Sequence, residues 1–266
     1  MVEFEQIATS EAAAPIYQGV IGEINLQKHP TFLKRPIKIL DLAGGSGRIG
    51  VTMKKECEAS LGPLSTVELS QVVDYVNLDI DRIALSKSPG RTIRDDVANT
   101  YPRLQAEEPF DFVLSISSSP SIQTLSPKTL NRIPPDILEL LLKSSEGIRG
   151  GLARITLLNA ALLLHPEGKY VLAGFMDQDS FEGTKSYVLE NGLGLELENT
   201  RFVELNEKVK ALFVQIDTDE KPGSKSFENL KANYNTYRLL TMRSGGHKDR
   251  QRLSNLLNKE VERYKQ

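Results

Sequence analysis

A cluster of glycines directly after a short apolar run places the strongest constraint on the fold of this 266-residue chain. Residues 37–42 read Ile-Lys-Ile-Leu-Asp-Leu, and Ala43-Gly-Gly-Ser-Gly47 follows before a segment of helical character begins at Arg48. This succession of strand, glycine turn and helix brings the backbone close to a nucleotide-like ligand. Glycine suits such a turn because it adopts backbone angles that a Cβ would forbid. The sequence therefore predicts a ligand site at this turn.

Segments of strand character alternate with segments of helical character along most of the chain. Alternation of this kind favours a largely parallel sheet with helices on both faces. The two last strands are separated only by 206–210, which suits a hairpin, so one of them is expected to run antiparallel. We predict an α/β fold, a doubly wound, mostly parallel, seven-stranded sheet with an antiparallel terminal hairpin. The expected strands are 37–42, 72–79, 92–93, 110–116, 169–175, 201–205 and 211–216.

Composition argues against several other classes of protein. No run approaches the roughly 18 apolar residues of a membrane span, and the acidic start Met-Val-Glu-Phe-Glu-Gln does not resemble a signal peptide. The single cysteine excludes an internal disulfide framework and a cysteine-rich zinc site. Three histidines, far apart in the sequence, make a histidine metal cluster an unfavourable reading, so no metal is expected. We therefore expect a cytoplasmic protein.

Charge divides the chain into an acidic body and a basic end. Residues 221–266 hold 11 Lys and Arg against 4 Asp and Glu, a net charge of +7, whereas the preceding residues hold 22 against 31, a net charge of −9. We divide the chain into an N-terminal helical cap (1–36), a nucleotide-binding domain (37–220) and a basic C-terminal extension (221–266). The extension is interpreted either as a solvated helix or as a segment that recruits an acidic macromolecule.

The order acid-x-Ala-Gly-Gly-Ser-Gly at Asp41–Gly47 resembles motif I of the class I S-adenosylmethionine (SAM) dependent methyltransferases. Further landmarks follow in the family's order: Asp79 after the second strand, Asp96-Val97 after the third, Phe110-Asp-Phe-Val-Leu in the fourth, and Leu162-Leu-Leu-His-Pro-Glu-Gly before the fifth. The resemblance covers roughly 37–216. It implies a Rossmann-like fold, SAM as the cofactor and methyl transfer to an acceptor that the sequence does not identify.

The resemblance also implies which residues bind the cofactor. Backbone amides of the turn suit the carboxylate of the methionine part, and Asp41 suits its amino group. A carboxylate at Asp79 would accept hydrogen bonds from both ribose hydroxyls. Asp81 competes with Asp79 and is alternatively a helix N-cap, and Asp95 competes with Asp96 for the adenine. The full implied set is Asp41, Ala43, Gly44, Gly45, Gly47, Asp79, Ile80, Asp96 and Val97.

The region expected to bind the acceptor departs from the family's better-known patterns. The fourth strand leads into Ser117-Ser-Ser-Pro-Ser121, which has no acidic, amide or aromatic side chain. Ser117 and Ser119 are the candidates for contacting an acceptor, or this segment is simply a turn. Residues 123–151 form either a substrate lid or a helix that packs on the core.

Two alternatives to an active methyltransferase stay open. The serine-rich edge is compatible with a methyltransferase-like binding protein that has lost catalysis. A nicotinamide oxidoreductase is the other alternative, but such a site places its acidic residue about 20 positions beyond the glycines, and Asp79 lies 32 beyond Gly47.

Overall fold

The computed structural model describes residues 13–30, 32, 34–61, 69–116, 148–176, 178–217, 221–233, 237–245 and 248–265. Ser117, Ser119 and most of the segment 123–151 lie outside the described residues, so the predictions made for them stay predictions. Residues 148–151 belong to the first turn of a long helix.

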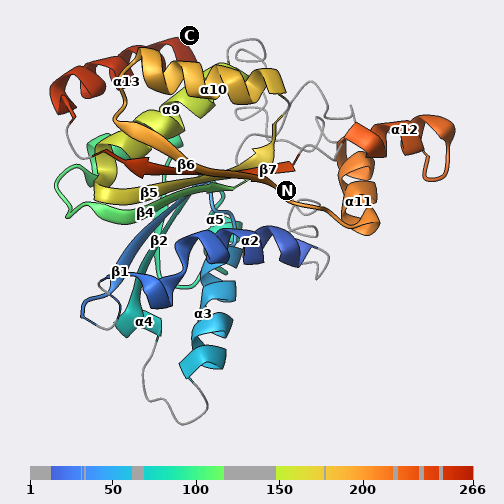
Figure 1. Cartoon of the computed structure of the whole chain (residues 1–266), viewed down its shortest axis with the longest axis horizontal. Helices are drawn as coiled ribbons and strands as arrows, with labels where there is room; N and C mark the ends of the chain where they lie inside the picture. The colour runs from blue at the N-terminus through green and yellow to red at the C-terminus, as the bar shows by residue number, and fades with distance from the viewer. Residues whose placement is uncertain are drawn as a thin grey trace.

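A seven-stranded sheet in the order β3-β2-β1-β4-β5-β7-β6 forms the centre of the molecule (Figure 1). β1, β2, β3, β4 and β5 are mutually parallel, and β7 runs antiparallel to both of its neighbours, β5 and β6. The predicted fold class is therefore confirmed. The strands are β1 (Ile37–Leu42), β2 (Val73–Asp79), β3 (Arg91–Arg94), β4 (Phe110–Ile116), β5 (Leu164–Phe175), β6 (Leu195–Phe202) and β7 (Tyr237–Ser244).

Helices cover both faces of this sheet. In Figure 1, α9, α10 and α13 lie over one face and α2 and α3 over the other, while α11 and α12 form an outlying pair beyond the first residues of β7. The helices are α2 (Ala14–Ile24), α3 (Arg48–Leu61), α4 (Leu69–Val72), α5 (Arg82–Leu85), α6 (Thr100–Leu104), α9 (Ile148–Leu163), α10 (Gln178–Glu190), α11 (Glu207–Asp217), α12 (Lys225–Asn233) and α13 (Arg250–Lys265), with short 3-10 turns η2 (Leu26–Lys28) and η3 (Val97–Asn99).

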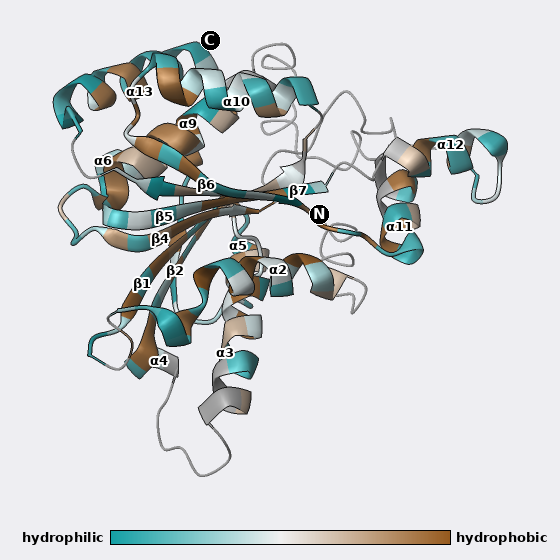
Figure 2. Cartoon of the chain, viewed as in Figure 1, coloured by the Kyte–Doolittle hydropathy of each residue, from teal (hydrophilic) through white to brown (hydrophobic). Residues whose placement is uncertain are grey.

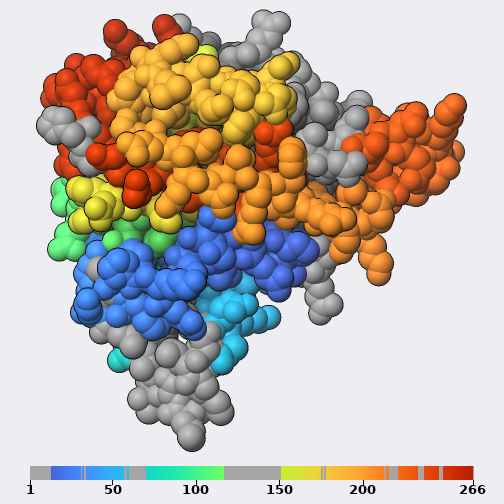
Figure 3. Space-filling view, viewed as in Figure 1, coloured from blue at the N-terminus to red at the C-terminus, as the bar shows by residue number. Residues whose placement is uncertain are grey.

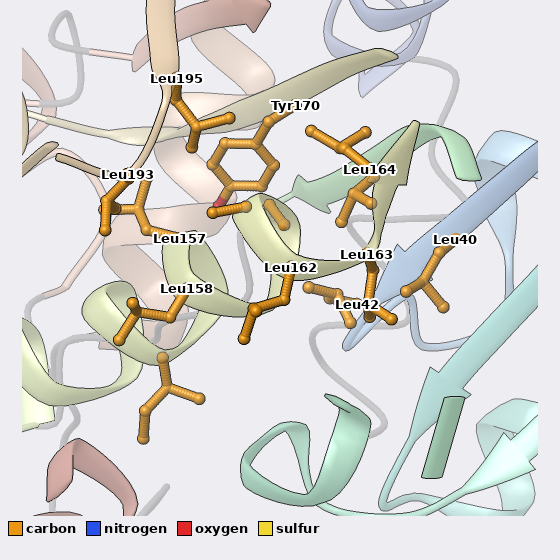
Figure 4. Close-up of a cluster of buried hydrophobic side chains, with 14 of the residues drawn as sticks. Leu40, Leu42, Leu157, Leu158, Leu162, Leu163, Leu164, Tyr170, Leu193 and Leu195 are labelled. Carbon is orange, nitrogen blue, oxygen red and sulfur yellow. The ribbon is translucent and has the colours of Figure 1, made fainter. Parts of the chain in front are cut away.

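Each face of the sheet has its own apolar core, because successive strand residues point to opposite sides. On one face Leu40 and Leu42 of β1 pack with the leucines of α9 and with Tyr170 of β5 (Figure 4). On the other face Ile37 and Ile39 pack with residues of α2 and α3. The central strands are accordingly apolar along most of their length, whereas α10 and α13 also present polar residues outward (Figure 2).

The C-terminal half of the hairpin differs from the sequence prediction. Residues 211–216, predicted as a strand, belong to helix α11, whose N-terminus is capped by the Asn206 side chain accepting the Val209 N–H at 3.0 Å. The strand that pairs with β5 is instead β7, which lies within 221–266. The chain between the hairpin strands therefore contains two helices rather than five residues, and these protrude in the space-filling view (Figure 3).

The segment 221–266 also supplies α13, which packs against α9. Leu253 and Leu257 of α13 are buried in the same core as the leucines of α9. The Asp249 side chain caps this helix by accepting the Arg252 N–H at 2.9 Å. The basic segment therefore contributes both a strand and a packed helix. None of the described helices is both long and apolar enough to cross a membrane.

Candidate functional site

The glycine turn leaves β1 at the carboxyl edge of the sheet and leads into α3. Gly45 and Gly47 have φ angles of +54° and +68°, the left-handed region that favours glycine. Ala43 also has a positive φ, +54°, although a Cβ makes this conformation costly by roughly 1–2 kcal/mol. The Gly47 N–H donates to the Gly44 carbonyl at 2.9 Å, which closes the turn.

Gly44 allows two polar side chains to approach the turn closely. A Cβ at this position would lie 2.5 Å from both Asn77 Oδ1 and Asp41 Oδ2, closer than real carbon atoms come. Asn77, buried on β2, donates from Nδ2 to the Gly45 carbonyl at 2.8 Å and to Ser88 Oγ at 2.9 Å. Asn77 was not identified by the sequence analysis, and it connects the turn to the segment after α5.

Asp41 is almost completely buried, with 2% of its surface exposed. Its Oδ2 accepts a hydrogen bond from the Tyr75 hydroxyl at 2.5 Å. Burial raises the pKa of the Asp41 carboxyl to about 7, against the lowering effect of the Tyr75 hydrogen bond, and the nearby Asp79 charge raises it further. The second oxygen, Oδ1, has no hydrogen-bond partner among the described residues.

Three buried polar atoms around the turn share this lack of a partner within the described part of the chain: Asp41 Oδ1, Ser46 Oγ and Asn77 Oδ1. Buried polar groups are normally hydrogen-bonded, and each exception calls for an explanation such as an absent ligand or water. Two of the three are pure acceptors, so they favour a ligand that carries N–H or O–H donors.

Asp79 at the end of β2 faces back towards the turn. Its Oδ2 accepts the Gly45 N–H at 2.9 Å, and its Oδ1 accepts the Asp81 N–H at 2.8 Å. Burial raises the pKa of Asp79, although its backbone hydrogen bonds act in the opposite direction. The Ile80 backbone N–H also hydrogen-bonds to this carboxylate. A carboxylate offers about four acceptor positions, so one position is left for a ligand.

Asp81 is the N-cap of helix α5, the second of the two roles that the sequence allowed for it. Its Oδ1 accepts the Ile83 N–H at 2.9 Å at the start of α5. Ile80, between the two acidic residues, leaves 43% of its surface exposed, which is unusual for a large apolar side chain. Ile80 therefore provides an apolar surface beside Asp79.

The hydrogen bonds after β3 distinguish Asp95 from Asp96, the two candidates for contacting the adenine. Both oxygens of Asp95 are used within the chain: Oδ1 accepts from the Asp96 N–H and from Asn99, and Oδ2 accepts from Arg103. Among the described residues, Asp96 accepts the Ala98 N–H alone, through Oδ1 at 2.7 Å. Oδ2 of Asp96 is thus the carboxylate oxygen of this pair that is left for a ligand.

A buried asparagine on α9 holds this loop against that helix. Asn159 donates to the Val97 carbonyl at 3.0 Å and accepts the Tyr101 N–H at 3.0 Å. Val97 itself is buried in the adjoining core. Tyr264 of α13 lies close enough to Asp96 for the Asp96 charge, after burial, to contribute to raising the Tyr264 pKa to about 12. The C-terminal helix therefore borders the site.

The structure thus brings together, at the carboxyl edge of β1, β2 and β3, the turn residues, Asp79, Ile80, Asp96 and Val97. It also adds the Ser46 side chain, which lies within the glycine motif, and Tyr75 and Asn77 of β2, for which the sequence offered no motif signal. Among the described residues, no group of three or more His, Cys, Asp or Glu side chains could hold a metal ion.

No protein-family model matches the chain, and no curated protein matches its sequence. Solved structures that resemble it include Aeropyrum pernix fibrillarin in complex with SAM (12% identity, 89% of this chain, 75% of that chain, TM-score 0.47). The Burkholderia thailandensis 1,6-didemethyltoxoflavin-N1-methyltransferase with bound 1,6-didemethyltoxoflavin and S-adenosylhomocysteine is another (12% identity, 89% of this chain, 79% of that chain, TM-score 0.44). By its strand order, antiparallel β7 and glycine turn, the chain has the Rossmann-like fold of class I methyltransferases.

Proposed function

We propose that the chain is a SAM-dependent methyltransferase that binds its cofactor at the glycine turn. The observation that carries this proposal is the group of unpartnered buried atoms around the turn, above all Asp41 Oδ1. An ammonium group satisfies such an oxygen and offsets the cost of burying its charge. The amino group of the methionine part of SAM provides this chemistry.

The other carboxylates fit the remaining parts of the same cofactor. Beside its three backbone hydrogen bonds, Asp79 retains an acceptor position for a ribose hydroxyl. Oδ2 of Asp96 would accept from the adenine amino group, with Ile80 and Val97 on either side of the ring. The backbone amides of residues 43–47 at the start of α3 suit the carboxylate of the methionine part.

The bound cofactor would supply an activated methyl group on a positively charged sulfur. The chain has to orient the acceptor in line with this group and exclude water. Ser117 and Ser119 remain the candidates for orienting the acceptor, because they follow directly from β4. A general base is required only if the acceptor loses a proton.

Calorimetry with S-adenosylhomocysteine, SAM and NAD on the full chain tests this proposal. We expect micromolar binding of the two adenosyl compounds. A ligand at 100 times its Kd stabilises the folded state by about 2.7 kcal/mol, which should raise the melting temperature by roughly 5 °C or more. A response to NAD without a response to SAM would favour the oxidoreductase alternative. SAM binding without methyl transfer to any acceptor class would favour the inactive alternative.

Recruitment of an acidic macromolecule by the basic segment is a secondary proposal. Several of its cations contact their own chain: Lys248 donates to the Ala161 carbonyl, and Arg252 donates to the carbonyls of Asn191 and Gly192. The proposal therefore depends on the exposed cations Lys221, Lys225, Arg250, Lys259 and Lys265. If it is correct, RNA affinity should fall steeply between about 50 and 200 mM salt. No RNA affinity at low salt would leave the segment a structural one.

A further inference from the structure

A second group of unusual contacts surrounds Arg238, near the start of β7. Arg238 is 9% exposed and shares its face of the sheet with Leu240 and Met242, the face covered by α9, α10 and α13. Its guanidinium carbon lies 4.8 Å from the ring centre of Phe181 and 4.5 Å from that of Phe202. These cation–π contacts fix the position of the guanidinium.

One nitrogen of this guanidinium is buried without a hydrogen-bond partner in the described part of the chain. An arginine has five N–H donors, and Arg238 uses Nη2 to donate to Gln178 Oε1 at 2.8 Å. Its Nε is buried without a partner, and Arg238 forms no ion pair within the described part of the chain. Gln178 also donates to Glu182 at 3.0 Å, so a neutral amide separates Arg238 from that carboxylate. A buried charge without a counter-charge is unfavourable.

The adjoining helix makes this position still less favourable for an isolated cation. Gln178 and Phe181, which contact Arg238, belong to the first turn of α10, a helix of 13 residues. The N-terminus of a helix carries partial positive charge and favours anions. The first turn of α10 already carries one acidic side chain, Asp179. Arg238 and the start of α10 both favour a negative group near Gln178, and a single arginine charge is balanced by one carboxylate.

Arg238 also lies on the side of the sheet where the acceptor is expected. It pairs with Gly174 of β5, and the preceding residue, Ala173, pairs with Ile116 at the end of β4. Neighbouring strands are about 4.8 Å apart, so the two strand spacings from β4 across β5 to β7 place the Arg238 backbone roughly 10 Å from the end of β4. Arg238 and the expected acceptor site therefore lie at the same edge of the sheet.

We propose that Arg238 binds the carboxylate of the methyl acceptor, which is therefore a small organic acid. This inference rests on the proposed methyltransferase function, since it places the acceptor beside the cofactor. Phe181 and Phe202 orient the guanidinium, and Gln178 occupies one Nη2 position, leaving the other terminal N–H groups to donate to the carboxylate.

The experiment compares small carboxylates with their neutral amides on the full chain saturated with S-adenosylhomocysteine. Acetate, lactate and benzoate are titrated against acetamide, lactamide and benzamide at constant ionic strength, with inorganic phosphate as a further probe. The variants are Arg238→Met and the charge-retaining Arg238→Lys. Arg243→Met is the matched control, because Arg243 lies on the same strand, exposed, 3.8 Å from Glu196.

We expect at least one carboxylate to bind, its amide not to bind, and Arg238→Met to weaken carboxylate binding by at least roughly tenfold. Arg243→Met should bind as the wild type does. Equal binding of acids and amides, binding of phosphate alone, or unchanged binding in the Arg238 variants would overturn the assignment. If Arg238→Met does not fold, the acid–amide comparison and Arg238→Lys decide the question. Titration of S-adenosylhomocysteine in the same samples separates failure of this inference from failure of the proposed function.

Discussion

Buried polar side chains at the two edges of the central sheet differ in whether their hydrogen bonds are satisfied within the chain. At the amino edge, Asp111 of β4 is buried but fully engaged: it receives two hydrogen bonds of 2.7 Å from Arg35 and a third from the Lys38 N–H at 2.9 Å. At the carboxyl edge, Asp41 of β1 has one oxygen without a partner in the described structure, and Arg238 has a buried Nε in the same condition.

This difference separates a structural ion pair from the two proposed ligand sites. A buried polar group that is fully hydrogen-bonded within the chain stabilises the fold, whereas an unsatisfied one destabilises it. The pKa values follow the same division. Burial raises the pKa of Asp111, but the Arg35 and Lys38 hydrogen bonds and the Arg35 charge outweigh it and hold the pKa below the ordinary value. Burial dominates at Asp41, whose pKa is raised to about 7.

The largest expected effect is that of Asp41→Asn on the pH dependence of stability. This substitution removes the charge and keeps the shape of the side chain. Because the folded-state pKa of Asp41 is raised, the folded chain binds the proton more tightly than the unfolded chain. Wild-type stability is therefore lost as pH rises from about 4 to about 7, by up to about 4 kcal/mol. We expect Asp41→Asn to lack this loss and to be the more stable protein at pH 8 in urea unfolding without ligand.

The same substitution should weaken S-adenosylhomocysteine binding, because the amino group of the ligand loses a charged acceptor. A hydrogen bond to a charged group contributes about 1.5–3 kcal/mol, so calorimetry should show a loss of roughly tenfold or more. Identical pH dependence in the variant and the wild type would contradict the view that Asp41 is a buried carboxylate held for a ligand.

Asp111→Ala should have the opposite consequences at the amino edge. Loss of the charged hydrogen bonds with Arg35 should destabilise the chain by roughly 2–3 kcal/mol at neutral pH. Since the folded-state pKa of Asp111 is lowered, its stabilising effect is present above the unfolded pKa and is lost as pH falls. In urea unfolding, the difference in stability between variant and wild type should therefore shrink as pH falls from 7 to below about 4. A weakened affinity for S-adenosylhomocysteine in the folded variant would break the comparison.

The sequence predicted those parts of the fold in which local pattern and tertiary environment agree. The apolar runs 37–42 and 110–116 form β1 and β4 with the predicted bounds. The run 211–216 was assigned to a strand because a short apolar segment has no periodicity that distinguishes strand from helix. Asn206 followed by Glu207 is an N-cap signal that would have favoured the helix.

The two arginines of β7 explain why this strand was missed. Arg238 and Arg243 made 237–244 resemble the charged segment around it, whereas pairing with β5 and β6 buries most of the strand. The glycine turn was recognisable because its conformation is specified locally by glycine. The partners of Asp41 and Arg238 were not, since contacts such as Tyr75 with Asp41 depend on the register between strands.

The smallest expected effect is the difference in ligand affinity between variants of two neighbouring acidic residues at the carboxyl edge, Asp79 and Asp81. Asp79→Ala should weaken S-adenosylhomocysteine binding by roughly 1–3 kcal/mol, because it removes the ribose acceptor and the support of the Gly45 N–H. Asp81→Ala should leave affinity nearly unchanged, because its carboxylate caps α5. Loss of such a cap typically costs about 1 kcal/mol of stability, and less is expected here because α5 spans only Arg82–Leu85. Calorimetry and thermal unfolding of both variants would measure the two effects separately. If Asp81→Ala weakens binding and Asp79→Ala does not, the ligand approaches the edge from the α5 side and the proposed ribose contact is wrong.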